Sequence, residues 1–495
     1  MRQWSRMRRI SSKPARNSDV PARDSLRQDI ETCRRALSVR PADREAMNNL
    51  GAALLGLGEV EEAIRMFGKA ISSAPACSAL VSNYLLALNY SGRLEPQAVA
   101  HAHLTIGRSH FASPTRPHPV PPPGKRKLRV GYVCAGFHFH PAAFFMLPLL
   151  DQHDRDRFEI FCYANVARPD DYTARIRKAA DHWRDLHGVS DTEAARRIRR
   201  DRIDILIDRT GHFEGNRLPL FARRPAPVQV TLPGYPATTG VPAIAYRITD
   251  AVADPPGTTE QWHSETLVRL SGPFACYAPP ANSPTPILLP DDASRPVTFG
   301  SFNGRQKFTR NMLELWAALL RHLPNTRLVV HHAFDGHREV APEFSAPILR
   351  VFRQCGVDAA RIAFLGCLPL DEHLRAFHQV DLILDTYPYN GMTTTCESLW
   401  MGVPVITLAG PHHAARVSAS FLTAAGADEW IAQTPQQYFD LALRFGRDRS
   451  RLRRARLSLI NRVRKCPLFN AKSYTSKLER AYLDMFRRQI QAPVN

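Results

Sequence analysis

One stretch of the sequence, residues 381–408, constrains the fold of this chain more than any other. It opens with an apolar segment that ends at Asp385, continues through a turn-forming segment around Pro388 and Gly391, and closes with a second apolar segment, Val405–Leu408. The residues between the turn and the second apolar segment predict a helix. Two strands joined in this way run parallel in one sheet, so the stretch predicts a strand–loop–helix–strand unit.

The predicted helix begins on three consecutive hydroxyl residues, Thr393, Thr394 and Thr395. The first turn of a helix has free backbone N–H groups and carries the positive end of the helix dipole. Because this turn follows the carboxyl end of a strand, it is a suitable place to bind a diphosphate. A second interpretation is that the threonines only cap the helix, as threonine does in many proteins without a ligand.

Residues 24–111 repeat at a fixed spacing. Equivalent residues lie 34 positions apart, which is the period of the tetratricopeptide repeat, a pair of amphipathic helices; the matching residues are Ala36 and Ala70, Pro41 and Pro75, Asn49 and Asn83, Leu54 and Leu88, and Gly58 and Gly92. A helix pair needs a neighbour to bury its apolar face, so these few repeats are expected to pack on the domain that follows. The preceding residues 1–23 are predicted to form a basic disordered arm.

The rest of the chain alternates between strand and helix patterns, which predicts two doubly wound α/β domains. A proline-rich linker at residues 112–126 precedes a first domain at 127–290, a second domain at 291–465 and an amphipathic helix within 466–495. Strands are expected at Lys127–Val133, Phe158–Tyr163, Ile203–Ile207, Val228–Leu232, Val297–Phe302, Arg327–His331, Ile362–Phe364, Leu382–Asp385 and Val405–Leu408. Two such domains place the carboxyl ends of their strands on either side of one cleft, where ligands bind.

Composition narrows the classes of function. The net charge of +20 suits phosphate-bearing ligands or acidic proteins, and binding of nucleic acid beyond nonspecific attraction is not expected because no nucleic-acid-binding motif accompanies it. Nine cysteines without a Cys-x-x-Cys pair argue against a disulfide framework and favour a reducing cytoplasm. The longest apolar run, Ala142–Leu150, is too short to cross a membrane, and no spacing of ligands fits a metal site. We therefore expect no membrane partner, no metal and no other cofactor.

Several motifs, in order along the chain, resemble those of the O-GlcNAc transferase and SPINDLY group of protein glycosyltransferases. They are the His-Pro pair at His140, the segment Gly234–Gly240, the Phe-Asn-x-x-x-Lys motif that ends at Lys307, and the segment Asp385–Pro404. The resemblance covers nearly the whole chain, from the repeats to the last helix. It implies the GT-B fold, two Rossmann-like domains preceded by all-helical repeats. It also implies inverting transfer of GlcNAc from the nucleotide sugar UDP-GlcNAc to Ser or Thr of an acceptor protein bound through the repeats.

The resemblance further implies roles for individual residues. Lys307 would be catalytic, because a fixed ammonium stabilises the negative charge that grows on the leaving diphosphate more in the transition state than before it. His140 would be the second catalytic residue, positioning the sugar or the acceptor and relaying a proton. The other residues expected at the donor are Asn303, His373, Thr393, Thr394, Glu397, Gly234 and Pro236, and those expected at the acceptor side of the cleft are His212, Asn49 and Asn83. For the two asparagines, hydrogen bonding within the repeats is an equal alternative.

Three positions depart from the GlcNAc enzymes and leave the donor open. Ala376 stands where those enzymes have an arginine and Leu370 where they have a lysine, which weakens the expectation of a uracil base. Met392 replaces a histidine before the threonines, and the SPINDLY group, which uses GDP-fucose, also lacks that histidine. A GDP-fucose-dependent protein O-fucosyltransferase is therefore an alternative, and a repeat scaffold with an inactive transferase domain is a second one.

Overall fold

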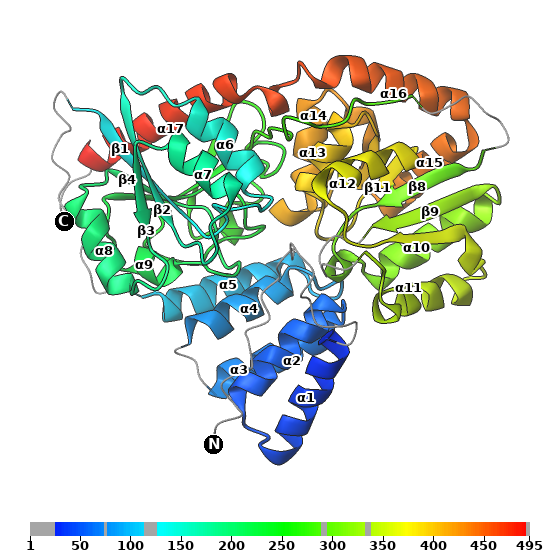
Figure 1. The fold of residues 1–495 in the computed structure, drawn as a ribbon, viewed down its shortest axis with the longest axis horizontal. Helices are drawn as coiled ribbons and strands as arrows, with labels where there is room; N and C mark the ends of the chain where they lie inside the picture. Colours follow the sequence, from blue (N-terminus) through cyan, green and yellow to red (C-terminus); the bar gives the residue numbers. More distant parts are fainter. Residues whose placement is uncertain (1–24, 74–76, 113–125, 289–294, 332–337, 492–495) are drawn as a thin grey trace.

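The computed structural model describes residues 25–73, 77–112, 126–288, 295–331 and 338–491, so the predicted basic arm and most of the predicted linker lie outside it. The amino-terminal region is all-helical, as predicted, and is drawn in blue in Figure 1. Ala53 and Phe67 are fully buried where its second and third helices pack together. The helices are α1 (Ser25–Val39), α2 (Arg44–Gly56), α3 (Val60–Ser73), α4 (Ser78–Leu88) and α5 (Pro96–His110).

A seven-stranded parallel sheet with the order β3-β2-β1-β4-β5-β6-β7 forms the centre of the first α/β domain. The direction of winding reverses between β1 and β4, which leaves a crevice at the carboxyl ends of these strands. The strands are β1 (Leu128–Cys134), β2 (Phe158–Ala164), β3 (His182–Asp185), β4 (Ile205–Asp208), β5 (Val228–Thr231), β6 (Tyr246–Asp250) and β7 (Thr266–Leu270). The helices between them are α6 (Ala143–Asp151), α7 (Asp171–Ala179), α8 (Asp191–Arg200) and α9 (Leu218–Ala222).

The four strands predicted for this domain are confirmed within two residues, but three strands were not predicted. β3 has the sequence His-Trp-Arg-Asp, β6 has Tyr-Arg-Ile-Thr-Asp, and β7 has Thr-Leu-Val-Arg-Leu. Each mixes charged residues with a few apolar ones, and β3 and β7 are only partly buried at the two edges of the sheet. An edge strand needs no continuous apolar run, so the pattern that reveals buried parallel strands is absent.

A second parallel sheet, with the order β10-β9-β8-β11-β12-β13, forms the centre of the second domain. Its central strands β8 and β11 are neighbours although they are far apart in the sequence, and all five predicted strands are confirmed. The strands are β8 (Val297–Ser301), β9 (Thr326–His331), β10 (Ile362–Leu365), β11 (Leu382–Leu384), β12 (Val405–Leu408) and β13 (Ile431–Ala432). The helices are α10 (Arg310–His322), α11 (Pro342–Gln354), α12 (Leu370–Ala376), α13 (Thr393–Trp400), α14 (Val417–Ala424), α15 (Pro435–Arg447) and α16 (Arg449–Val463).

The last helix, α17 (Ala471–Gln491), crosses back to the first domain and is drawn in red beside it in Figure 1. Leu478 and Tyr482 are fully buried in the core of the first domain. The hydroxyl oxygens of Tyr482 and Tyr132, the latter on β1, lie 3.2 Å apart. The predicted amphipathic helix is thus confirmed. Among the described residues, α17 included, no helix combines the length and the apolar character needed to cross a membrane.

Buried polar contacts join the two α/β domains directly. Asp254, which follows β6, is fully buried, and its carboxylate lies 2.7 Å from Nδ1 of His413 in the second domain. Arg416 donates from its Nε to the carbonyl of Val252 at 2.6 Å. Burial by itself would raise the pKa of Asp254, but His413 and His263 hold it well below its usual value. This group of contacts fixes the carboxyl ends of the two sheets relative to each other.

We expect Leu478→Ala to lower the free energy of unfolding by about 2–5 kcal/mol, because the change removes a fully buried side chain that joins α17 to the first domain. Urea denaturation followed by circular dichroism would measure the effect. Arg480→Ala, at an exposed position of the same helix, is the matched control and should change the unfolding free energy by less than about 0.5 kcal/mol. Equal denaturation midpoints for the two variants would contradict the assignment.

Candidate active site

Lys307 lies where the two central strands of the second sheet end. It is the last residue of the short turn η3 (Arg305–Lys307), which follows β8. Its Nζ donates hydrogen bonds to the carbonyl of Asn390 at 2.8 Å and to Oδ1 of Asn303 at 3.3 Å, and lies 4.3 Å from the centre of the Tyr389 ring. The structure thus brings together the predicted residues Lys307 and Asn303 and adds the loop that follows β11.

Burial is the main influence on the charge of Lys307. It lowers the pKa of the ammonium group from 10.5 to about 8, and the negative charge of Asp385 opposes this shift. Asp385 directly follows β11 and is 1 % exposed; it accepts hydrogen bonds from the backbone N–H of Gly391 and from the hydroxyl of Thr407, both at 2.8 Å. Lys307 is partly exposed, so its charge remains accessible to an anion.

The helix α13 begins at Thr393, as the sequence predicted. The residue at its cap position is Met392, so the threonines occupy the first turn instead of capping it, and no side chain caps the backbone N–H groups. The hydroxyl of the buried Thr395 lies 2.8 Å from that of Ser418, whereas Thr393 and Thr394 are partly exposed. The first turn therefore offers backbone N–H groups to an anion close to Asn390, the residue that binds Lys307.

His373 is held at both of its ring nitrogens. This residue of α12 is 9 % exposed, its Nδ1 lies 2.7 Å from Nε2 of His331, and its Nε2 lies 3.0 Å from the carboxylate of Glu397. His331, the last residue of β9, in turn lies 3.1 Å from the carbonyl of Leu365 through its Nδ1. The predicted residues His373 and Glu397 are thus in contact, and the contacts fix the orientation of the imidazole ring.

His140 is exposed at the carboxyl end of the first sheet, in the loop that follows β1. Its Nδ1 accepts a hydrogen bond from the backbone N–H of Ala142 at 3.1 Å. Partial desolvation of the ring, and then the charges of His138 and Arg209, lower the pKa of His140 below its usual value. The ring is therefore neutral near pH 7, and its proton is on Nε2, the nitrogen left for a ligand.

Gly234 leaves room for a buried cation beside His140. A Cβ at this position would lie 2.0 Å from Nη1 of Arg209, so no other residue fits here without displacing the guanidinium. Arg209 directly follows β4 and is 5 % exposed, and within the described residues its Nε has no hydrogen-bond partner. Burial lowers the pKa of this guanidinium. Pro236 is buried in the same loop as Gly234, so both predicted residues lie at this side of the first sheet.

The structure places His212 in an interface with the helical region instead of on the open surface of the cleft. The residue is 1 % exposed, and its Nδ1 lies 3.0 Å from the hydroxyl of Ser82 on α4. Its Nε2 lies 2.8 Å from the carbonyl of Thr239, and burial lowers its pKa to about 3. In this structure the ring fastens the helices to the first domain, and the expected role of His212 at the acceptor side stays a prediction.

Asn49 and Asn83 lie on neighbouring helix pairs and are connected through Asn48. Asn83 donates from its Nδ2 to Oδ1 of Asn48 at 2.8 Å, and Asn48 lies 3.5 Å from Oδ1 of Asn49. All three side chains are partly exposed. Hydrogen bonding within the repeats therefore uses part of their capacity, and the expected contact with acceptor backbone stays a prediction.

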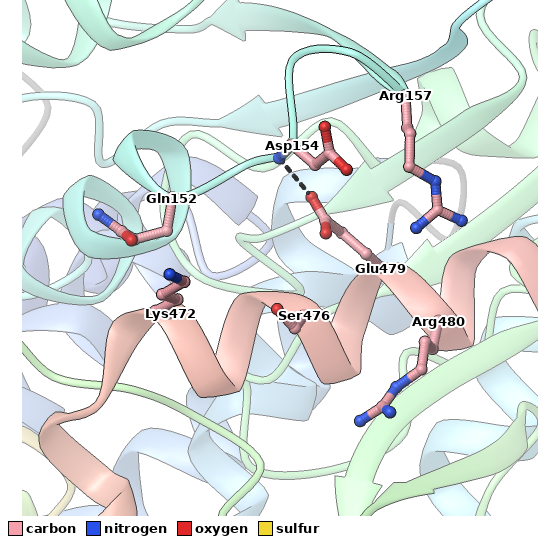
Figure 2. Close-up of a pocket in the computed structure, with 7 residues that line it drawn as sticks. All are labelled: Gln152, Asp154, Arg157, Lys472, Ser476, Glu479 and Arg480. Carbon is pink, nitrogen blue, oxygen red and sulfur yellow. Dashed lines mark hydrogen bonds between the residues drawn. The ribbon is translucent and has the colours of Figure 1, made fainter.

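A recess of about 420 Å³ lies away from these residues, between α17 and the segment that precedes β2 (Figure 2). Its central carboxylate, Glu479, accepts a hydrogen bond from the backbone N–H of Asp154 at 2.8 Å and lies 2.9 Å from Nδ1 of His153. These contacts fasten α17 to the first domain. In the described ranges, no group of three or more His, Cys, Asp or Glu side chains is placed to hold a metal ion, here or elsewhere.

Comparison with known proteins identifies the family. The sequence profile of glycosyl transferase family 41 matches residues 87–276 and 283–478. The chain belongs to this family. The solved structure of a mutant O-GlcNAc transferase from Thermobaculum terrenum has a TM-score of 0.87 to this family 41 protein at 36% sequence identity, over 94% of this chain and 88% of that one. The two α/β domains therefore have the predicted GT-B arrangement.

Curated relatives of this chain are named as probable UDP-N-acetylglucosamine–peptide N-acetylglucosaminyltransferases. The probable UDP-N-acetylglucosamine–peptide N-acetylglucosaminyltransferase SPINDLY of Oryza sativa subsp. japonica is 36% identical over 440 residues, which are 86% of this chain and 46% of that protein. The SPINDLY protein of Arabidopsis thaliana is 37% identical over 428 residues, 83% and 45% of the two proteins, and the SEC protein of the same plant is 31% identical over 407 residues, 78% and 40%. The chain spans about half the length of these curated relatives.

Several residues of the site were not predicted, among them Asn390, whose carbonyl accepts a hydrogen bond from Lys307. Asp385, His331 and Arg209 each end a central or neighbouring parallel strand or directly follow one. A search for polar residues at the carboxyl ends of predicted strands would have found these three, because ligands bind at that edge of a doubly wound sheet. Tyr389 does not lie directly at the end of a predicted strand, so the same search would not have found it. Its contact with Lys307 joins loops that follow two different strands.

We expect the affinity of this site for a nucleoside diphosphate to be highest at a pH far below 8. The affinity should fall as the pH rises through about 8, because Lys307 then loses its charge. Isothermal titration calorimetry between about pH 6.5 and pH 9.5 would measure the dependence. Lys307→Arg is the control, since a guanidinium stays charged over this range and should remove the decline. The same decline in Lys307→Arg would assign it to another group.

Proposed function

We propose that this protein is an inverting glycosyltransferase that moves GlcNAc from UDP-GlcNAc to a serine or threonine hydroxyl of an acceptor protein. The observation that carries the proposal is the ammonium of Lys307, held by Asn390 and Asn303 next to the uncapped first turn of α13. The names of the curated relatives and of the Thermobaculum terrenum enzyme support the same activity.

In the proposed reaction the oxygen of the acceptor hydroxyl forms a bond to the anomeric carbon of the sugar, while the bond from that carbon to the diphosphate oxygen breaks. The proton of the hydroxyl passes to water or to an oxygen of the departing diphosphate. Negative charge then grows on the departing diphosphate. Lys307 and the backbone N–H groups of Thr393 and Thr394 would stabilise this charge, and they act more strongly in the transition state than on the bound donor. A single displacement of this kind inverts the configuration at the anomeric carbon.

His140 would serve this reaction as a hydrogen-bond donor. Its Nδ1 lone pair already accepts the N–H of Ala142, so Nε2–H is the group that a sugar or acceptor oxygen meets. A ring whose pKa is lowered also has less tendency to take up a proton near pH 7. We therefore assign His140 to positioning of the substrate, with Gly234 and Pro236 lining the same side of the cleft.

The nucleoside end of the donor would bind beside His373 and Glu397. The resemblance assigns the ring at His373 to stacking on the nucleobase, and a ring fixed at both nitrogens is preorganised for such a contact. Glu397 would then hold His373 and face the sugar of the nucleoside.

The acceptor protein would bind through the helical region, where Asn49 and Asn83 are partly exposed. With so few repeats, a short extended segment of the acceptor or one dedicated partner is expected. We place the reaction in the cytoplasm, since a reducing compartment suits the nine cysteines, all of which lie in the described ranges and none of which forms a disulfide.

Comparison of UDP, UDP-GlcNAc, GDP and GDP-fucose by thermal shift and calorimetry tests the donor. We expect the uridine pair to bind and Lys307→Ala to weaken binding by about 10- to 100-fold, since hydrogen bonds to charged groups contribute about 1.5–3 kcal/mol. Lys465→Ala, which changes an exposed lysine, is the control. If only GDP and GDP-fucose bind, the proposed GlcNAc transfer is wrong and fucosyl transfer is favoured. If none of the four compounds binds, the alternative of a repeat scaffold with an inactive transferase domain is favoured.

We expect a chelator to leave the transfer rate unchanged, because Lys307 and the first turn of α13 supply the positive charge that a metal would otherwise provide. Mass spectrometry of the modified acceptor, with and without EDTA, would measure the rate. Loss of transfer in EDTA with recovery on addition of Mg²⁺ or Mn²⁺ would contradict the metal-free mechanism.

A further inference from the structure

The turn after α4, residues Asn89–Gly92, contacts all three parts of the protein; we call it the junction turn. Asn89 donates from its Nδ2 to the hydroxyl of Tyr235 in the first domain at 3.1 Å. Ser91 donates from its hydroxyl to the carboxylate of Glu61 within the helical region at 2.6 Å. The residue between them, Tyr90, reaches the second domain.

Tyr90 stacks on Tyr389, the ring that contacts Lys307. The two ring centres lie 4.9 Å apart with an angle of 15° between the planes, which is a stacked aromatic pair. Tyr90 is 5 % exposed and Tyr389 is 8 % exposed, so the pair is shielded from water. The Nζ of Lys307 lies 4.3 Å from the centre of the Tyr389 ring, within the range of a cation–π contact. A continuous series of contacts therefore leads from the junction turn to the ammonium group.

The helical region also supports the segment that carries Lys307 at two further places. Arg305, two residues before Lys307, packs on Gly58 at the end of α2, where a Cβ would lie 2.7 Å from Nη1. Gly58 has a φ of +78°, a conformation that glycine adopts at low cost. Thr309, two residues after Lys307, packs on Gly92 of the junction turn. The η3 segment thus rests on the helical region on both sides of the lysine.

We propose that Tyr90 is a positioning residue for the transfer reaction, and that it holds Lys307 in place through the ring of Tyr389. The helical region is then a structural part of the donor site and not only a surface for the acceptor. This inference rests on the role proposed above for Lys307. It predicts that truncation of a side chain in the helical region impairs the chemical step.

The expected loss of activity follows from the packing of Tyr90 against Tyr389. Removal of the Tyr90 ring leaves one face of Tyr389 without a packing partner, so the ring can tilt and water can reach Lys307. An ammonium that is displaced by about 1 Å stabilises the departing diphosphate less well, and such displacements cost up to about 100-fold in rate. Among the described residues, Asp385 is the charged group that acts on the pKa of Lys307. Burial raises the pKa values of Tyr90 and Tyr389, so both hydroxyls stay neutral near pH 8.

The test compares Tyr90→Ala, Tyr90→Phe and Tyr84→Ala. Tyr84 lies on the preceding helix α4 and contacts Gly68 within the helical region, so its truncation controls for general loosening of the helices. We expect Tyr90→Ala to lower kcat by about 10- to 100-fold with a smaller change in KM, and Tyr90→Phe to keep at least about a third of the rate, because the ring is retained. Equal losses in Tyr90→Ala and Tyr84→Ala would overturn the proposal.

A second measurement does not depend on activity. Lysine isotope-labelled at Cε allows the titration of Lys307 to be followed by NMR, with Lys307→Arg to assign its signal. We expect Lys307 to titrate near pH 8 in the unchanged protein and in Tyr84→Ala, and at a higher pH in Tyr90→Ala, because water then solvates the ammonium. An unchanged titration in Tyr90→Ala would overturn the proposal even if the rate fell.

The two measurements also separate this inference from the proposed function. If Lys307→Ala keeps full transfer activity, the proposed role of Lys307 fails, whatever the Tyr90 variants do. If Lys307→Ala is inactive while Tyr90→Ala has the rate and titration of the unchanged protein, only the role of Tyr90 fails.

Discussion

Burial of one ammonium group is the constraint on which the rest of the site depends. A cation removed from water is costly unless hydrogen bonds and opposite charge replace its hydration. Lys307 has the carbonyl of Asn390, the amide oxygen of Asn303, the face of Tyr389 and, farther away, the charge of Asp385. Each of these comes from a loop at the carboxyl end of β8 or β11. The two strands must therefore be neighbours for the ammonium to be tolerated at all.

The rest of the two α/β domains and the helical region surround these loops. The second sheet supplies the uncapped helix α13 and the pair His373 and Glu397, while His140 lies in the loop that follows β1 of the first sheet. The contact between Asp254 and His413 joins the first α/β domain to the second, and Tyr90 of the helical region stacks on Tyr389 of the second domain. In the proposed reaction a ligand would meet groups that are already oriented, which reduces the entropy that binding must overcome.

Much of this could be predicted from the sequence because the relevant signals are local. The threonine segment, the lysine at the end of its motif and the buried strands of both sheets are visible as short patterns, and a 34-residue period reveals the helices. What could not be predicted depends on contacts between distant segments. His212 is exposed or buried according to whether α4 packs on it, and Tyr90 gains its significance only from a ring about 300 residues later. The edge strands β3 and β7 were not predicted, because a partly buried strand does not need the continuous apolar sequence by which a buried parallel strand is recognised.

The crossing of α17 has a consequence for the order in which the protein is built. The ribosome makes the second domain before it makes α17, yet Leu478 and Tyr482 complete the core of the first domain. Throughout synthesis of the second domain, the nascent first domain therefore exposes apolar surface that α17 will later cover. Exposed apolar surface of this kind binds chaperones and promotes aggregation, so the nascent protein needs protection until α17 has been made.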